Sequence, residues 1–150
     1  MTPLAEELKR VVSGEVDDAP ETLERMSRDT SLFKVRPKVV VSPRDAADIE
    51  ALVRFVSERK KTDPAISITT RAAGTDMSGG VLGDSIIVNT TAHLNRVIEV
   101  GDGYAITEPG AYFRDFDAET KKKGFEMPGY PASRNLAAVG GMVANDAGGE

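Results

Sequence analysis

The uneven distribution of glycine is the feature that most constrains how this chain can fold. Only Gly14 precedes residue 74, and the other 13 of the 14 glycines fall between Gly74 and Gly149. Glycine permits sharp turns, left-handed backbone and close approach of the backbone to other groups. The sequence therefore predicts ordinary helices and strands in the first half, and a second half built from turns and close backbone approaches.

Composition excludes several classes of function. The 150 residues fit one domain, and 24 acidic against 19 basic residues give a net charge of -5, which argues against nucleic-acid binding. The chain has no cysteine and a single histidine, His93, so thiolate or His-rich metal sites and a cysteine nucleophile are excluded. No apolar run approaches the roughly 20 residues of a transmembrane helix, and the polar first ten residues are no secretory signal. We expect a cytoplasmic protein without a metal.

The first 36 residues are predicted to be a polar, helical N-terminal extension without a functional role. Leu4, Leu8, Val11 and Val12 recur at helical spacing up to a stop at Ser13 and Gly14. A second short helix is expected over residues 20–28, with Leu23 and Met26 on one face.

A βαβ unit is predicted to follow. Residues 38–41 form a strand, and residues 42–61 form a helix with Ser42 as a candidate N-cap and Pro43 in its first turn. Residues 65–71 form the next strand. Strand, helix and strand in this order imply a parallel pair. The buried stripe of the helix is expected to consist of Ile49, Leu52, Val53 and Val56.

The second half is predicted to form short strands and one helix. Strands are expected over 85–89, 96–100 and 104–108, with a tight hairpin turn at 101–103. A helix over 112–123 has Phe113, Phe116 and Ala118 as apolar candidates, and Gly124 follows it. Residues 125–130 are expected to be extended, 131–134 to form a turn, and 136–147 to be apolar with small side chains.

The glycine loop at residues 74–80 is the first candidate site. It follows a strand of the predicted βαβ unit, where ligands bind in open α/β sheets, and glycines can aim successive amides at one point. Thr75, Ser78 and the preceding Arg71 would suit a diphosphate. The loop matches neither a Walker motif nor Gly-x-Gly-x-x-Gly, so a plain turn is about as well supported. Asp76 would repel a phosphate unless its carboxylate points outward or holds the loop through an Asx-type bond.

A second candidate segment lies about sixty residues further on. It consists of Pro128-Gly129-Tyr130-Pro131-Ala132-Ser133-Arg134 followed by Val139-Gly140-Gly141-Met142-Val143-Ala144-Asn145-Asp146-Ala147-Gly148-Gly149. The paired glycines allow close approach of a flat group or of another chain segment. Taken alone, this segment indicates tight packing more than a ligand site.

The two segments in this order resemble the FAD-linked oxidase family, whose PCMH-type FAD-binding domain is shared by glycolate oxidases, D-lactate dehydrogenases and vanillyl-alcohol oxidases. The resemblance covers about residues 37–150. It implies an α+β (α/β) fold in which a small βαβ subdomain precedes a subdomain with a mixed or antiparallel sheet.

The resemblance also implies a set of FAD-binding residues. The first loop would cradle the pyrophosphate with backbone amides, and the second segment would line the flavin and its ribityl-diphosphate arm. Relatives that bind flavin covalently carry a histidine at the position of Thr75, so we expect noncovalent FAD. The expected cofactor-binding residues are Ala73, Gly74, Thr75, Asp76, Met77, Ser78, Gly79, Pro131, Ser133, Gly140, Gly141, Ala144, Asn145 and Gly148.

The resemblance further implies a flavin-dependent oxidoreductase that moves a hydride from a small 2-hydroxy acid, such as glycolate or D-lactate, to flavin N5. Family members continue into the rest of the flavin domain and a substrate-binding cap. We therefore expect an N-terminal piece, inactive and weak in FAD binding by itself. No residue in it is a convincing catalytic base, and for Tyr130 and Glu126, which lie near the flavin segment, core or surface roles are favoured. Oxidation of another alcohol or a sugar, and a non-catalytic domain binding a nucleotide or a partner protein, remain alternatives. The oligomeric state is left open.

Overall fold

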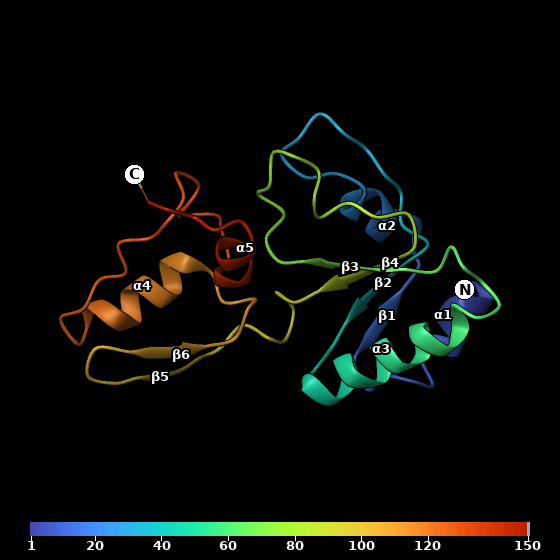
Figure 1. The fold of residues 1–150 in the computed structure, drawn as a ribbon, viewed down its shortest axis with the longest axis horizontal. Helices are drawn as coiled ribbons and strands as arrows, with labels where there is room; N and C mark the ends of the chain where they lie inside the picture. Colours follow the sequence, from blue (N-terminus) through green and yellow to red (C-terminus); the bar gives the residue numbers. More distant parts are fainter. Residues whose placement is uncertain (150) are drawn as a thin grey trace. The chain divides into compact units, whose positions relative to one another are not determined.

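The computed structural model describes residues 1–149, and the chain divides into two compact units. Unit 1 comprises Met1–Arg71 and Asp76–Asn89, and unit 2 comprises Ala72–Thr75 and the residues from Thr90 onward (Figure 1). Within the described part of the chain, no helix is long and apolar enough to cross a membrane.

Unit 1 is built on a four-stranded sheet with the strand order β1-β2-β4-β3. β1 runs antiparallel to β2, whereas β2 and β3 each pair in parallel with β4, so that Ile87 lies beside both Val40 and Thr69. The elements of unit 1 are α1 (Pro3–Leu8), β1 (Glu15–Asp17), α2 (Pro20–Met26), β2 (Val39–Ser42), α3 (Ala46–Arg59), β3 (Ile68–Arg71) and β4 (Ile86–Asn89).

The predicted βαβ unit is present, but its two strands are not neighbours. β2 and β3 are parallel, as expected, and β4 lies between them and pairs with each. The pattern of strand, helix and strand identifies the direction of two strands. It does not show that a later strand inserts between them.

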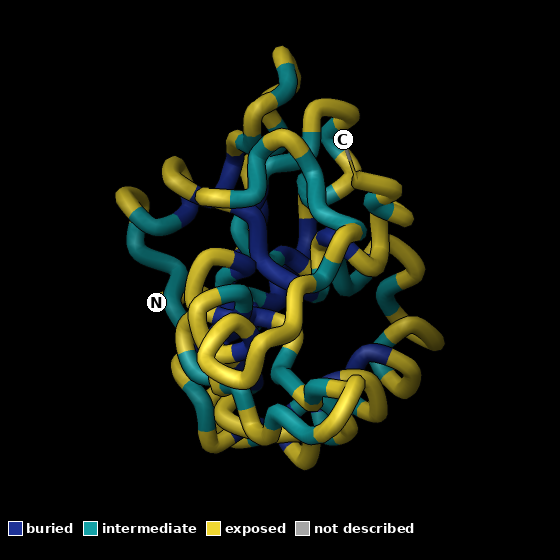
Figure 2. Tube along the Cα trace, turned by 90° about the vertical axis from the view of Figure 1, so that its left-hand side faces the viewer, coloured by how far each residue is buried: buried dark blue, intermediate teal, exposed yellow. Residues whose placement is uncertain are grey.

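Helices cover this sheet on both faces, which explains why the three consecutive valines of β2 are all buried. Val39 and Val41 pack with Leu8 of α1 and Leu52 of α3, in a cluster that also holds Ile66, Ile86 and Val88. Val40 faces the other way, together with Ile87, Leu23 and Met26 of α2. Buried segments are dark blue in Figure 2. Parallel strands covered on both faces favour such continuous apolar runs.

The N-terminal residues are part of this sheet. α1 ends at Leu8, earlier than the periodicity predicts, and β1 then pairs with β2. The prediction that residues 1–36 are helical therefore missed a strand of three residues, which is too short to show a clear alternating pattern. Ala5, Leu8, Val12 and Val16 belong to the main apolar cluster.

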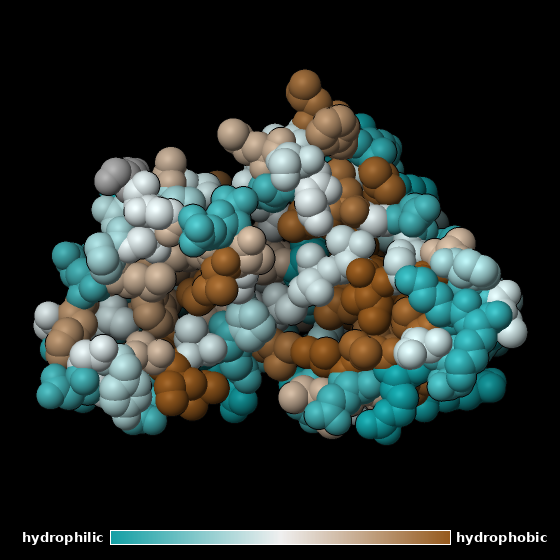
Figure 3. All heavy atoms as spheres, in the orientation of Figure 1, coloured by the Kyte–Doolittle hydropathy of each residue, from teal (hydrophilic) through white to brown (hydrophobic). Residues whose placement is uncertain are grey.

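Two details of α3 differ from the sequence prediction. Asp45 is the N-cap, with its carboxylate accepting the Asp48 N–H at 3.0 Å, whereas Ser42 ends β2 and pairs with Glu15. Leu52 and Val56 are buried as expected, but Val53 is 53% exposed. Residues of high hydropathy are brown in Figure 3. The exposed large apolar side chains of unit 1 include Leu32, Phe33 and Met77.

Unit 2 combines a hairpin with two helices. β5 (Val97–Val100) and β6 (Ala105–Thr107) form an antiparallel pair across the predicted turn, where Gly103 has φ +78°. α4 (Phe113–Lys121) buries Phe113 and Phe116, but the third predicted apolar position, Ala118, is exposed. α5 (Val139–Ala144) adds Val139 and Met142 to the same apolar cluster.

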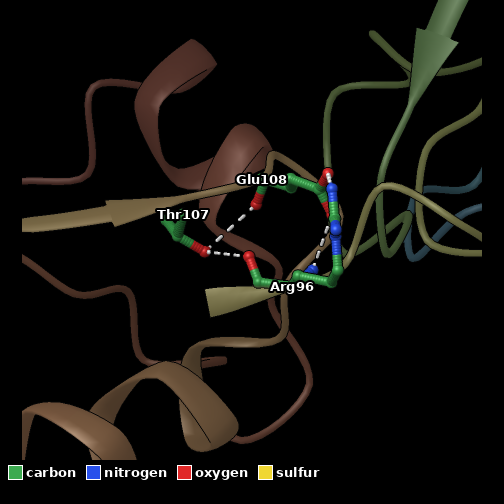
Figure 4. Close-up of polar contacts among 3 residues, drawn as sticks. All are labelled: Arg96, Thr107 and Glu108. Atoms are coloured by element: carbon green, nitrogen blue, oxygen red, sulfur yellow. Dashed lines mark hydrogen bonds and ion pairs between the residues drawn. The ribbon is translucent and has the colours of Figure 1, made fainter. Parts of the chain in front are cut away.

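An ion pair closes the open end of the hairpin (Figure 4). The Arg96 guanidinium contacts both oxygens of Glu108, with the shorter distance 2.8 Å from Nη2 to Oε1, and the Arg96 N–H donates to Oε2 at 2.8 Å. Thr107 Oγ1 donates to the Arg96 carbonyl at 3.1 Å. The hydrogen bonds from Arg96 hold the pKa of Glu108 below its ordinary value. These contacts fix the strand end that leads into Pro109 and Gly110.

Candidate functional site

The predicted glycine loop is divided between the two units. Ala72–Thr75 belongs to unit 2, and the residues from Asp76 onward return to unit 1. Gly74 is buried with φ +74°, and Gly79 has φ +83°. A left-handed backbone strains any residue with a side chain, so glycine is required at these two positions.

The Asp76 carboxylate is turned into its own loop, which is the second of the two arrangements that the sequence left open. Its Oδ2 accepts the Ser78 N–H at 3.2 Å, the Ser78 hydroxyl at 2.7 Å and the Gly80 N–H at 2.7 Å. The hydroxyl bond from Ser78 and the amide bond from Gly80 hold the pKa of Asp76 below its ordinary value. The negative charge of Asp76 is therefore stabilised within residues 76–80.

Arg71 does not present its charge to a ligand in the way its position at a strand end suggests. The side chain is buried at the end of β3, and Nη1 donates to the Met26 carbonyl at 3.4 Å. Burial lowers the pKa of Arg71, and the nearby negative charge of Asp29 opposes this. The guanidinium thus forms a hydrogen bond inside unit 1.

In unit 2, the double glycine has two different environments. A Cβ on Gly140 would lie 2.7 Å from the Cβ of Pro109, and the Gly140 N–H donates to the Pro109 carbonyl at 2.8 Å. Gly140 therefore lets the chain at Pro109 pack directly against the backbone of α5. A Cβ on Gly141 would be 3.9 Å from the Cβ of Ala72, and Gly141 is exposed. Gly141 of α5 therefore lies near Ala72, two residues before the glycine loop.

The remaining predicted residues of unit 2 shape two turns. The carbonyl of Pro131 accepts from Arg134, and the carbonyl of Ser133 accepts from Leu136 and Ala137. At the end of α5 and after it, Ala144, Asn145 and Gly148 are exposed, and a Cβ on Gly148 would meet nothing within 4 Å. The small side chains leave this backbone open to a ligand.

Tyr130 and Glu126 both contact other side chains of unit 2. The Tyr130 ring lies 5.5 Å from that of Phe113 and packs on the apolar cluster of unit 2, while Arg134 stacks over its ring at 4.7 Å. Glu126 is exposed and forms an ion pair with Lys121.

The sequence missed two residues that contact the loop. Thr30 Oγ1 donates to the Asp76 carbonyl at 2.8 Å, and the Phe33 ring packs on Gly79. They lie in a polar segment without periodicity and far along the chain from their partners, so no local pattern could reveal the contact.

The residues present are compatible with a dinucleotide. Left-handed glycines shape the loop, its acidic residue is hydrogen-bonded within the loop, and exposed residues without long side chains follow α5. Such backbone suits a large ligand held through main-chain groups.

Comparisons with known proteins agree with this chemistry. A family model described as "FAD binding domain" matches residues 37–150. The chain is 31% identical over 127 residues to D-2-hydroxyglutarate dehydrogenase of Escherichia coli (strain K12), covering 83% of this chain and 12% of that protein. It is 28% identical over 113 residues to D-lactate dehydrogenase of Archaeoglobus fulgidus, covering 74% of this chain and 24% of that one.

Solved structures share the fold. An alkyldihydroxyacetonephosphate synthase matches with a TM-score of 0.78 and 19% identity over 99% of this chain and 33% of its own. The 4-ethylphenol oxidase from Gulosibacter chungangensis matches with a TM-score of 0.73 and 18% identity over 89% of this chain and 27% of its own. These are proteins of the PCMH-type FAD-binding fold, as the sequence predicts. The chain spans about an eighth to a quarter of the length of the two curated relatives above.

Proposed function

Since this chain belongs to the FAD binding domain family, we propose that it is the FAD-binding portion of a flavin-dependent dehydrogenase that oxidises a small 2-hydroxy acid. The names of the curated relatives include D-2-hydroxyglutarate dehydrogenase, D-lactate dehydrogenase and glycolate oxidase subunit GlcD, and all three substrates are 2-hydroxy acids. Bound FAD would supply the acceptor for a hydride, while the protein supplies binding and orientation.

The observation that carries the proposal is the conformation of the glycine loop. Gly74 and Gly79 are left-handed, and the Asp76 carboxylate is hydrogen-bonded within its own turn, so the loop can bring backbone close to a diphosphate without an unpartnered carboxylate. The proposed FAD contacts are Ala73, Gly74, Thr75, Asp76, Met77, Ser78, Gly79, Pro131, Ser133, Gly140, Gly141, Ala144, Asn145 and Gly148.

This observation also weakens the non-catalytic alternative. The sequence feature that best supports that alternative is Asp76, because a carboxylate in the loop would repel a phosphate. A carboxylate that accepts three hydrogen bonds from its own loop has much of its charge compensated there. Oxidation of a different alcohol or a sugar is less favoured, because the sequence relatives named above act on 2-hydroxy acids by their names.

We further propose that FAD is held noncovalently and that the protein works in the cytoplasm. Thr75 occupies the position where covalently flavinylated relatives would carry histidine, and the single histidine, His93, lies in a turn after β4. Acid precipitation of the flavin-loaded protein is expected to release all of the flavin into the supernatant. Flavin that stays with the pellet would contradict noncovalent binding.

The test of the proposal uses the natural polypeptide that contains residues 1–150. We expect it to bind FAD, measured by the quenching of flavin fluorescence, and we expect Gly74→Val to abolish binding. The matched control is Gly103→Val. Gly103 is also left-handed and also in unit 2, but it lies at the tip of the hairpin with nothing within 4 Å of its Cβ position.

Three results would each contradict a part of the proposal. A wild-type protein that does not bind FAD would overturn the function, and equal loss of binding in Gly74→Val and Gly103→Val would overturn the loop assignment. For the substrate, D-lactate, glycolate and D-2-hydroxyglutarate are tested with a dye as electron acceptor. Reduction of the dye with none of the three, but with a simple alcohol or a sugar, would refute the 2-hydroxy acid class.

A further inference from the structure

A loop of unit 1 that precedes the family-matched region contacts the glycine loop. This loop comprises residues 27–35 and is named the buttress loop here, and the match to the FAD binding domain begins only at residue 37. In Figure 1 its light-blue trace runs beside the yellow-green trace of residues 76–80. Leu32, Phe33 and Met77 are exposed apolar side chains in these two segments, at 99%, 59% and 79%.

The buttress loop is held in a defined conformation. Its ends are joined by a hydrogen bond of 3.0 Å from the Val35 N–H to the Ser27 carbonyl. Within it, Asp29 Oδ1 accepts the Ser31 N–H at 2.8 Å, and Lys34 Nζ lies 2.7 Å from Glu24 Oε1 of α2. Because the buttress loop is anchored independently of the glycine loop, it can act as a fixed support.

Two contacts connect this support to the glycine loop. Thr30 Oγ1 donates a hydrogen bond of 2.8 Å to the carbonyl of Asp76. The Phe33 ring lies against Gly79, where an added Cβ would come within 2.9 Å of the Phe33 Cδ2 atom. One contact therefore fixes the beginning of the 76–80 turn and the other fixes its left-handed glycine.

The Thr30 contact has a direct consequence for an amide of the proposed cradle. In a trans peptide, the carbonyl and the following N–H point in opposite directions. When Thr30 holds the Asp76 carbonyl, it also fixes the Met77 N–H on the opposite side of the peptide, away from the buttress loop. Met77 is one of the residues whose amide is proposed to contact the FAD diphosphate.

We propose that Thr30 and Phe33 are positioning residues for FAD binding, which orient the glycine loop and its Met77 amide without touching the cofactor. This inference rests on the proposed function. It adds to the cofactor site a segment that lies outside the region matched by the family.

The experiment measures the dissociation constant for FAD in four variants of the natural polypeptide. Thr30→Val keeps the shape of the side chain and removes the hydroxyl, so we expect FAD affinity to fall about three- to tenfold. Thr30→Ser keeps a hydroxyl and should restore most of the affinity. Phe33→Ala should weaken binding about threefold or more because Gly79 loses its backing. Leu32→Ala is the control from the same loop, and its affinity should match the wild type.

Readouts on the FAD-free protein distinguish positioning from a general loss of stability. Thermal unfolding of Thr30→Val should stay within about 2 °C of the wild type, while amide exchange in residues 73–80 should become faster. Unchanged FAD affinity in Thr30→Val and Phe33→Ala, with binding still lost in Gly74→Val, would overturn the positioning role and leave the proposed function intact. A large fall in melting temperature in Thr30→Val that Thr30→Ser shares would likewise overturn it. Absence of FAD binding by the wild type would instead overturn the proposed function.

Discussion

Asp48 shows how one carboxylate joins distant parts of unit 1. The side chain is 5% exposed, and its oxygens accept from the Ser13 N–H at 2.7 Å, the Gly14 N–H at 2.9 Å and the Arg44 N–H at 2.8 Å. Burial by itself would raise the pKa of Asp48, but these hydrogen bonds and that of the Ser13 hydroxyl outweigh it, and the pKa is lowered. The same residue lies in the first turn of α3, so it ties this helix to the chain before β1.

We expect Asp48→Asn to destabilise unit 1 by about 1–3 kcal/mol at neutral pH, because an amide NH₂ would face a backbone donor. The folded pKa is lowered, so the stabilisation by Asp48 is fully present above its ordinary pKa and is lost as pH falls through the lowered value. The difference between variant and wild type should therefore shrink below about pH 3.8. Urea unfolding followed by circular dichroism at several pH values measures this.

The control for this prediction is Glu50→Gln, which removes one negative charge from the exposed side of the same helix. Its stability should stay close to that of the wild type at every pH. An Asp48→Asn variant as stable as Glu50→Gln at neutral pH would show that the carboxylate contributes nothing specific.

For single residues, the sequence predicted which residues have a structural role better than it predicted which groups they contact. Asp76 could either point outward or hold its loop, and only the folded structure decides between these. Ser42 and Asp45 are both good N-cap residues, and pairing of Ser42 with β1 decided in favour of Asp45. The contacts of Thr30 and Phe33 require two segments that are far apart in the sequence to meet in the fold, and no local propensity encodes this.

At the scale of elements, the two glycines of α5 are expected to respond in opposite ways to alanine. Gly140→Ala places a Cβ 2.7 Å from Pro109 Cβ and 2.8 Å from its carbonyl oxygen, which should cost about 1–3 kcal/mol. Gly141→Ala meets only ordinary contact at 3.9 Å and should gain up to about 1 kcal/mol from helix propensity.

Tyrosine fluorescence during urea unfolding measures both changes. All three tyrosines, Tyr104, Tyr112 and Tyr130, lie in unit 2, and the chain has no tryptophan, so this signal reports on the unit that contains α5. Each alanine variant is the control for the other. If both destabilise unit 2 equally, Gly140 has no special role in the approach of Pro109.

The type and range of each element were more predictable than which elements lie side by side. The hairpin of β5 and β6, helix α3 and helix α4 follow from periodicity and turn residues, and they lie within a few residues of their predicted ranges. β1 was missed because three residues carry no usable pattern. The insertion of β4 between β2 and β3 was missed because adjacency in a sheet is set by packing over the whole unit.

For the whole molecule, the first 36 residues are expected to be essential for folding of unit 1. They provide α1, β1 and α2, four residues of the main apolar cluster, and two of the backbone partners of Asp48. A chain that begins at residue 37, where the family match begins, should lose the cooperative unfolding transition of unit 1 in circular dichroism.

A graded version of this test keeps the full length. Leu8→Ala, at a position with no exposed surface, should destabilise unit 1 by about 2–5 kcal/mol without changing the tyrosine signal of unit 2. A cooperative transition of unit 1 in the chain that begins at residue 37 would show that the N-terminal segment is dispensable.

The strand order also has a consequence for synthesis on the ribosome. β2 and β3 leave the exit tunnel before β4, yet β4 is the strand that joins them. Until Ile86–Asn89 has emerged, Val39 and Val41 cannot complete their sheet, and the nascent chain holds an unpaired edge on the apolar strand β2 and another on β3. A pause in translation shortly before residue 86 would therefore prolong the state most prone to aggregation and most dependent on chaperones.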